Sequence, residues 1–227
     1  MELFWTIIKE LTQGFGNTLL LFAVTLIAAL PLGLVLAFGA MSKFKPLKYL
    51  VKGLVWVIRG TPLMLQVLLV SFLPMMLGVK AKDIAGALNI DINTLMFWFV
   101  ALAFAINYAC YFSEIYRAGI ESIPVGQYEA GKVLGLTKGQ VFFKIVLMQV
   151  IRRILPPMSN EIITLVKDTA LAQVLGVVDL LNAAKHAVNH YVVLTPFIYA
   201  AIFYLIFNGL LTLVFGWIEK KLSYYKV

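Results

Sequence analysis

The chain has 227 residues, of which 62% are hydrophobic and 13% are charged, and its mean hydropathy is +0.92. Soluble domains contain about one quarter charged residues, so this composition indicates a membrane protein. The net charge of +8 does not favour nucleic-acid binding, because the Lys and Arg residues lie at the ends of apolar runs. The single cysteine, Cys110, excludes an intrachain disulfide, and we interpret it as a helix-packing residue.

The order of the apolar windows predicts an all-α, polytopic membrane protein with one domain over residues 1–227. An amphipathic segment at residues 1–11 is expected to lie along the membrane surface, and nothing in it resembles a cleaved signal peptide. A membrane-spanning helix needs about 20 apolar residues. Five spans are therefore predicted, at residues 11–42, 60–79, 92–113, 155–178 and 191–218, with residues 179–190 as an exposed connection.

The basic residues are distributed unevenly between the two predicted sides of the membrane. Fourteen of the 19 Lys and Arg residues lie in three segments on one predicted side: residues 42–59, residues 117–153 and the C-terminal tail. Four lie on the other side. Lys and Arg accumulate on the cytoplasmic side of membrane proteins. The N-terminus is therefore predicted outside and the C-terminus in the cytoplasm.

A long polar stretch separates the third and fourth predicted spans, and we call residues 118–154 the elbow. Pro124 suits the first turn of a short helix, and Gly135 suits the left-handed position that ends one. A short capped helix held out from the membrane has the shape of a plug for a groove in another protein. Spacing alone leaves an ordinary polar loop as the alternative.

A second helix of the elbow is predicted from a capping box at Thr137 and Gln140. Its apolar and basic residues separate onto two faces, as in a helix that lies on a membrane surface. Pro156 and Pro157 are expected to end this helix and to let the chain turn into the bilayer.

The fourth predicted span carries a polar stripe within a sector of about 120° of a helix. Charged groups at membrane depth are costly unless they are paired or face a wet cavity, so the stripe is expected to face the interior. Its members are Asn160, Glu161, Thr164, Lys167 and Asp168.

Two interpretations of this stripe stay open. In one, Asn160, Glu161 and Thr164 line a substrate path, which Gln66 and Asn107 of other spans complete. In the other, the stripe is a structural seam in which Lys167 is neutralised by Asp168 or by a neighbouring helix. Arg59 and Glu114, near the ends of the second and third spans, are interpreted as structural ion-pair residues that pair with each other or with nearby groups.

Several functions are disfavoured. His186 and His190 lie four residues apart, but no third ligand is near, so we expect no metal site and an exposed pair. No G-x-x-x-x-G-K-[ST] motif occurs, and no nucleophile–base constellation, so this chain is not expected to be an enzyme or to bind a cofactor.

The elbow resembles a family signature. Its sequence Y-E-A-G-K-V-L-G, followed by I-V-L-M, is similar to the E-A-A…G…I-x-L-P signature of ABC importer permeases, with Gly131 and Met148 as departures. The similarity extends over most of residues 17–215. Its further segments are similar to polar amino-acid permeases for histidine, arginine, glutamine and cystine: R-G-T-P-L-M-L-Q, S-E-I-Y-R-A-G-I-E-S-I-P-V-G-Q and L-P-P-M-S-N-E-I-I-T-L-V-K-D-T-A-L.

This resemblance implies a permease subunit of an ATP-driven importer in a prokaryotic inner membrane. The elbow helix at residues 124–136 would be a coupling helix that docks on a separate ATPase dimer, which binds ATP and Mg. Further partners would be a second permease subunit, identical or not, an extracytoplasmic binding protein, and membrane lipid. The residues implied in ATPase coupling are Gln127, Glu129, Ala130, Gly131 and Gly135.

The substrate class follows from charge. The ionisable groups of the stripe sum to −1, which favours a polar amino acid with a cationic group. The alternative function is a proton-coupled secondary transporter with Glu161 or Asp168 as the proton carrier. That alternative gives the elbow no role.

Overall fold

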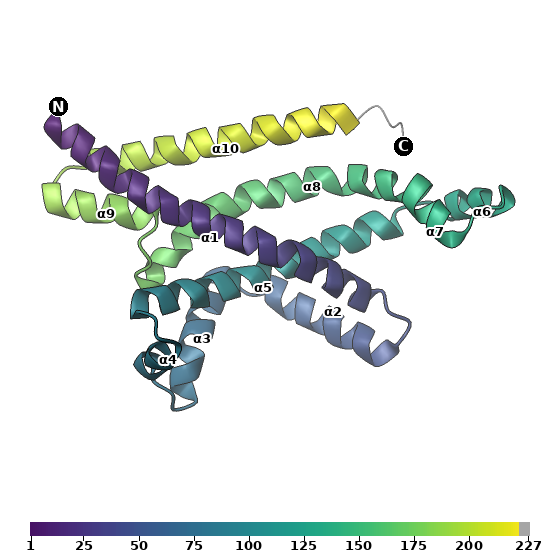
Figure 1. The fold of residues 1–227 in the computed structure, drawn as a ribbon, viewed down its shortest axis with the longest axis horizontal. Helices are drawn as coiled ribbons and strands as arrows, with labels where there is room; N and C mark the ends of the chain where they lie inside the picture. Colours follow the sequence, from purple (N-terminus) through teal and green to yellow (C-terminus); the bar gives the residue numbers. More distant parts are fainter. Residues whose placement is uncertain (223–227) are drawn as a thin grey trace.

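The computed structural model describes residues 1–222, and every regular element in that range is a helix (Figure 1). Lys226, counted above in the basic tail, lies outside the described residues. The elements are α1 (Glu2–Ala40), α2 (Lys45–Arg59), α3 (Leu63–Met76), α4 (Ala81–Leu88), α5 (Ile92–Glu121), α6 (Val125–Val133), α7 (Lys138–Val141), the π-helical η1 (Phe142–Val146), α8 (Leu147–Asp168), the 3₁₀-helical η2 (Thr169–Leu175), α9 (Leu180–Tyr191) and α10 (Thr195–Leu222).

Three helices, α1, α5 and α10, are long and apolar enough to cross a membrane, and the pair α2–α3 would be a fourth span with a bend of 108°. The predicted total of five also includes residues 155–178, which belong to the more polar α8 and η2, so that total stays a prediction. The expected surface helix at residues 1–11 is wrong. These residues continue into α1, whose 39 residues extend over about 58 Å at 1.5 Å per residue.

The bend between α2 and α3 lies at the Gly60–Thr61–Pro62 sequence. A proline disfavours helical geometry in the residue before it, so Thr61 interrupts the helix. The Gln66 side chain braces the bend, because its Nε2 donates to the carbonyl oxygen of Ile58 at 2.7 Å and to Oγ1 of Thr61 at 2.8 Å. The predicted second span is therefore shorter than expected, and the basic segment before it is a helix rather than a loop.

The main core lies where α1 crosses α5. A Cβ atom on Gly33 of α1 would lie 2.9 Å from the carbonyl oxygen of Ala109 and 2.9 Å from Cβ of Phe112, so the two backbones approach each other closely. Small residues allow such approach in membrane helices. Tyr108 and Phe104 of α5 are fully buried in the same core. This packing fixes the face of α5 that carries the site residues.

The expected helix end at Pro156 and Pro157 is wrong, because both prolines lie inside α8. Their missing N–H groups remove two backbone hydrogen bonds from the helix. The carbonyl oxygens left without these donors are those of Arg152 and Arg153, one turn earlier, yet the helix continues past both prolines. One helix therefore runs from the elbow to Asp168.

Residues 179–190 are not the exposed connection that was expected, because they cap and form α9. Asp179 is 1% exposed and accepts hydrogen bonds from the backbone N–H groups of Leu181 and Asn182. Thr18 of α1 accepts from the N–H of Leu180, and a Cβ on Gly14 would lie 2.8 Å from the Asp179 carbonyl oxygen. Burial raises the pKa of the Asp179 carboxyl to about 6.

Candidate functional site

The elbow has the local structure that the sequence predicts. Pro124 is the N-cap of α6, one residue earlier than expected, and Gly135 has φ +71° directly after the helix. Thr137 and Gln140 form both hydrogen bonds of the capping box at the start of α7. The tip of the elbow therefore consists of α6 and α7 joined by a left-handed turn, and it lies beyond the ends of α5 and α8 (Figure 1).

The elbow packs on a small apolar cluster of its own. Ile123, Val141, Val146 and Val150 are buried together, and Gly131 of α6 contacts Val141 so closely that a Cβ on it would lie 2.5 Å from Cγ2. This cluster holds α6 in a fixed orientation relative to α7 and α8.

The outer face of α6 is exposed. Three of the five residues implied in ATPase coupling are exposed: Glu129 and Ala130 on α6, and Gly135 in the turn after it. Gln127 is half-buried and its Oε1 accepts from Nε2 of Gln149 at 3.3 Å, whereas Gly131 is buried in the cluster. Apolar side chains accompany the exposed residues, namely Val125, Tyr128, Val133 and Leu134.

A cavity of about 390 Å³, the central cavity, lies between the α2–α3 bend, α5 and α8. This volume is in the usual range for ligand sites, about 300–1,000 Å³. Two carboxylates, Glu161 and Asp168, line it with Thr164 of the same helix. The complete lining consists of Thr61, Pro62, Leu63, Asn107, Tyr108, Tyr111, Glu161, Thr164 and Asp168.

Hydrogen bonds fix several of these side chains. Asn107 lines the cavity and donates through Nδ2 to Oε1 of Gln66 at 2.9 Å. Gln66 is therefore behind the wall, where it joins Asn107 to the α2–α3 bend. The hydroxyl of Tyr108 donates to Oδ2 of Asp168 at 2.7 Å, so this carboxylate is held by α5.

The polar stripe is divided, which corrects the expectation that all of it faces the interior. Asn160 and Lys167 are exposed, and neither lines the central cavity. Within residues 1–222 the expected ion pair between Lys167 and Asp168 is absent, because Asp168 is bonded to Tyr108 instead. The part of the stripe that lines the cavity is Glu161, Thr164 and Asp168.

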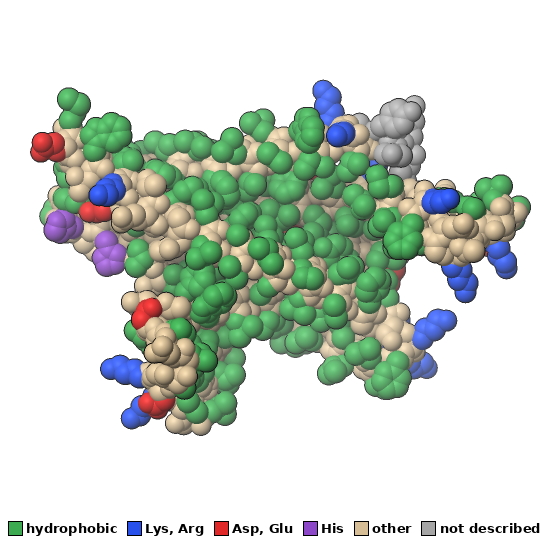
Figure 2. Space-filling model, viewed as in Figure 1, with side chains coloured by type: hydrophobic (Ala, Val, Ile, Leu, Met, Phe, Trp, Pro, Cys, Tyr) green, Lys and Arg blue, Asp and Glu red, His purple; other side chains and the backbone are tan. Residues whose placement is uncertain are grey.

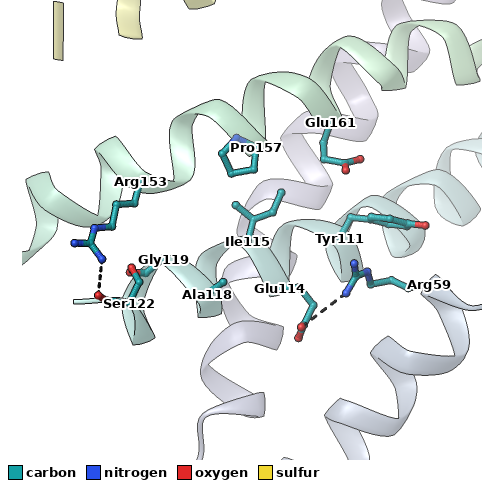
Figure 3. A pocket seen from close by; sticks show the side chains of 10 residues that line it. All are labelled: Arg59, Tyr111, Glu114, Ile115, Ala118, Gly119, Ser122, Arg153, Pro157 and Glu161. Carbon is teal, nitrogen blue, oxygen red and sulfur yellow. Dashed lines mark hydrogen bonds and ion pairs between the residues drawn. The ribbon is translucent and has the colours of Figure 1, made fainter. Parts of the chain in front are cut away.

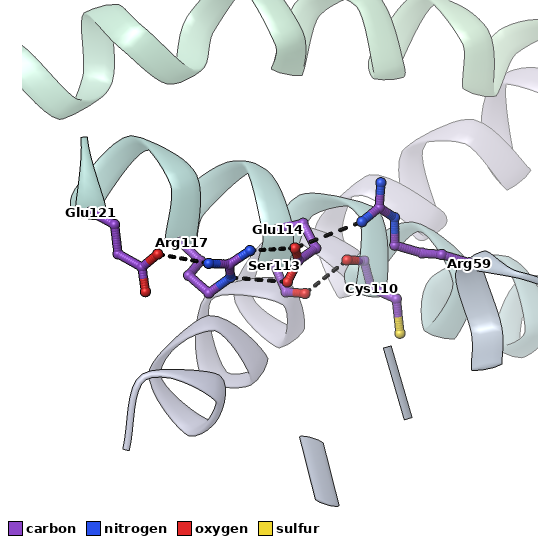
Figure 4. Close-up of polar contacts among 6 residues, drawn as sticks. All are labelled: Arg59, Cys110, Ser113, Glu114, Arg117 and Glu121. Carbon is purple, nitrogen blue, oxygen red and sulfur yellow. Dashed lines mark hydrogen bonds and ion pairs between the residues drawn. The ribbon is translucent and has the colours of Figure 1, made fainter. Parts of the chain in front are cut away.

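The expected pair of Arg59 and Glu114 is present but loose. Nη1 of Arg59 lies 3.8 Å from Oε2 of Glu114, and its guanidinium lies 5.0 Å from the ring centre of Tyr111. Arg117 binds the same carboxylate in a bidentate manner, at 2.6 and 3.1 Å, and also pairs with Glu121 at 2.7 Å (Figure 4). Glu114 is thus held mainly by Arg117.

A second cavity of about 500 Å³, the elbow-side cavity, lies between α5 and α8 nearer the elbow (Figure 3). Glu161 and Tyr111 lie at one end of it with Arg59. Arg153 lies at the other end, where its Nη1 donates to the carbonyl oxygen of Ser122. The complete lining consists of Arg59, Tyr111, Glu114, Ile115, Ala118, Gly119, Ser122, Arg153, Pro157 and Glu161.

Comparison with known proteins identifies the family. Residues 29–224 match the model of the binding-protein-dependent transport system inner membrane component. The chain belongs to this family. The L-cystine transport system permease protein TcyB of Bacillus subtilis is 36% identical over 98% of this chain and 89% of its own length. The arginine transport system permease protein ArtQ of the same organism is 36% identical over 95% of this chain and 94% of its own.

The fold is similar to that of a solved transporter. A structure described as an amino acid ABC transporter with histidines has a TM-score of 0.82 and 29% identity, with 96% of each chain covered. The predicted family, the all-α membrane fold and the role of an ABC permease component are therefore confirmed. The alternative of a proton-coupled secondary transporter gains no support from these relatives.

The sequence analysis missed five residues of this permease's central cavity: Thr61, Pro62, Leu63, Tyr108 and Tyr111. A signal for the first two was present, since a Gly-Thr-Pro sequence inside an apolar run marks a broken helix, and broken helices at membrane depth line cavities. The two tyrosines lie on the face of α5 that carries Asn107, at the spacing of one helical turn.

Neither histidine lines the central cavity or the elbow-side cavity. His186 and His190 are exposed on α9, as an exposed pair was expected, although they lie on a helix rather than in a loop. Among residues 1–222, His, Cys, Asp and Glu form no group of three that could hold a metal ion.

Proposed function

We propose that this permease carries a polar amino acid through the central cavity, with preference for a cationic side chain. The observation that carries the proposal is the charge of the lining. Glu161 and Asp168 line the cavity, and its described lining contains no Lys or Arg. A site with two carboxylates and a low dielectric favours an ammonium or guanidinium group.

The cavity lining is more acidic than the polar stripe as a whole. Lys167, which compensates one carboxylate in a simple count of the stripe, is exposed away from the lining. Tyr108 donates to Asp168 and so occupies one of its oxygens. Glu161 accepts no hydrogen bond within residues 1–222, so it is the carboxylate with the most capacity for a substrate cation.

The relatives' names agree with a polar amino acid but differ in the side chain. ArtQ is named for arginine, TcyB for L-cystine, and other relatives for glutamine. The side chain of arginine has a net positive charge, whereas the side chain of glutamine is uncharged and the second half of cystine carries an ammonium and a carboxylate group that cancel. A cavity lined by carboxylates favours a cationic side chain, so the lining of this chain favours arginine over cystine and glutamine.

The partners proposed are those of an ABC importer. A separate pair of ATPase subunits would bind ATP and Mg and dock on the exposed face of α6. A second permease subunit, identical or different, would complete the translocation path, and a binding protein would deliver the amino acid. The N-terminus would be outside and the C-terminus in the cytoplasm. The elbow and α9 lie at opposite ends of the molecule (Figure 1), and Lys and Arg side chains gather at the elbow end, which supports a cytoplasmic elbow (Figure 2).

The test is Glu161→Gln, which keeps the shape of the side chain and removes its charge. We expect uptake of L-arginine by cells that depend on this importer to fall about tenfold, which corresponds to about 1.4 kcal/mol. Uptake of L-glutamine should change less. Glu2→Gln, which neutralises an exposed carboxylate outside both cavities, is the matched control. Unchanged arginine uptake in the Glu161 variant would show that this carboxylate is structural.

A further inference from the structure

The two cavities share one wall. Glu161 and Tyr111 line both the central cavity and the elbow-side cavity. The other charged groups differ. In the central cavity they are carboxylates alone, whereas the elbow-side cavity has Arg59 beside Glu161 and Tyr111, and Arg153 at its far end (Figure 3). A ligand that moves from one cavity to the other along Glu161 therefore passes from an acidic lining to one that contains arginines.

Arg59 retains the capacity to bind an anion. Within residues 1–222 its one ion pair within 4 Å is long, at 3.8 Å to Glu114, and it donates no hydrogen bond. Its guanidinium also contacts the Tyr111 ring and interacts electrostatically with Glu161. Glu114 would keep a cationic partner without Arg59, because Arg117 binds its carboxylate through two hydrogen bonds. A guanidinium has five N–H donors in a planar fork that matches a carboxylate. The Arg59 side chain is also 42% exposed, so a ligand can reach it.

We propose that the elbow-side cavity is a second amino-acid site, in which Arg59 binds the α-carboxylate while Glu161 keeps the cationic group that it binds in the central cavity. This proposal rests on the proposed function, because it assumes that an amino acid reaches Glu161 through the central cavity. The cavity of about 500 Å³ is large enough for a ligand of this class. The mixed charge of its lining is what a zwitterion requires.

The shared carboxylate gives the site a role in release. An amino acid in the central cavity is held by its cationic groups, since carboxylates alone are the charged groups of that lining. When its carboxylate turns to Arg59, the cationic group bound by Glu161 keeps that contact, so the cation is never without a partner at membrane depth. Beyond Arg59, Arg153 at the elbow end offers the next positive charge on the way out. The second site is thus a release site on the elbow side.

Cysteine protection separates the two sites. Ala118 lines the elbow-side cavity alone and is exposed, whereas Leu63 lines the central cavity alone. The native Cys110 is 0% exposed, so the unsubstituted chain is the labelling blank. Ala118→Cys and Leu63→Cys are placed separately in the intact importer, in inside-out membrane vesicles without ATP. Both are treated with a membrane-impermeant thiol reagent, with and without L-arginine, L-glutamine or L-cystine.

We expect at least one of these amino acids to slow the labelling of both cysteines. Adding Arg59→Gln should raise the concentration that half-protects Ala118→Cys at least tenfold and leave the protection of Leu63→Cys within about twofold. Lys45→Gln removes an exposed cation from the same helix and should change neither.

Protection of Leu63→Cys without protection of Ala118→Cys would overturn the second site and leave the proposed function intact. Absence of protection at both positions would overturn the proposed function itself. Protection of Ala118→Cys that is unaffected by Arg59→Gln would refute the assignment of the carboxylate to Arg59.

Discussion

The contact between Gly131 and Val141 is the sharpest test of how the elbow is held. A Cβ on Gly131 would lie 2.5 Å from Cγ2 and 3.2 Å from Cγ1 of Val141, but 3.4 Å from its Cβ. Gly131→Ala therefore collides with the two methyl groups and not with the rest of the side chain. Val141 is 4% exposed within the elbow cluster, so it has little room to move away.

The magnitude follows from two opposing effects. Overpacking of a buried site costs about 1–3 kcal/mol. Alanine is better than glycine within a helix by about 0.5–1 kcal/mol. The net loss for Gly131→Ala should be about 1–2 kcal/mol of local stability, a factor of about 5–30 in the open population. Val141→Ala removes the colliding methyl groups, so the double variant should be more stable than the sum of the two single changes, by about 1 kcal/mol or more.

Amide hydrogen exchange of peptides from residues 124–141 measures this local opening directly. Gly139→Ala is the control, because a Cβ there has nothing within 4 Å. Gly131 does not fix the orientation of α6 if the amide exchange rates of Gly131→Ala match those of the control. The same conclusion follows if the change in opening free energy of the double variant equals the sum of the two single changes.

Three further predictions concern the elbow, the α9 cap and the topology. Gly135→Val forces a β-branched residue into φ +71° and should abolish transport while the chain still reaches the membrane; normal transport would remove α6 as the coupling element. Asp179→Asn keeps the cap but not the charge. The pKa of the Asp179 carboxyl is raised to about 6 in the fold, so the free energy of unfolding of the native chain should fall by roughly 3 kcal/mol as the pH rises from about 4 to above 6. Thermal unfolding measured over this pH range should show the fall in the native chain but not in the variant. A cysteine replacing Lys138 should be labelled only from the cytoplasm and one replacing Lys82 only from outside, and labelling of both from one side contradicts the predicted topology.

The sequence predicts best those features that depend on neighbouring residues. The helix start at Pro124, the left-handed Gly135 and the capping box at Thr137 depend on a few adjacent positions, and all three are present within one residue of the expected place. The two proline positions, Pro156 and Pro157, show where this approach fails. Proline is unfavourable in an isolated helix, but packing of α8 on α5 and α10 offsets the lost hydrogen bonds.

The candidate site shows the same limit. A helical sector groups Asn160 with Glu161 and Lys167 with Asp168, but it does not show which edge of the sector meets another helix. Tyr108, the partner of Asp168, is 60 residues away on α5, and no spacing rule connects the two. An ion pair between Arg59 and Glu114 could be predicted, since both lie at the same end of neighbouring spans. That Arg117 binds Glu114 at a much shorter distance than Arg59 does could not be predicted.

The unbroken α8 connects the two functional parts of the molecule. Its residues begin against the elbow cluster at Val150 and end at Glu161, Thr164 and Asp168, which line the central cavity. The opposite wall of that cavity is α5, which also ends at the elbow. An amphipathic surface helix separated from a membrane span at Pro156, as the sequence suggested, would let the elbow move without the cavity. A continuous helix couples the two parts, because its two ends stay joined by helical backbone even though Pro156 and Pro157 each lack one hydrogen bond. An ATPase that moves α6 would therefore move both walls of the cavity, and the carboxylates on them, at the same time.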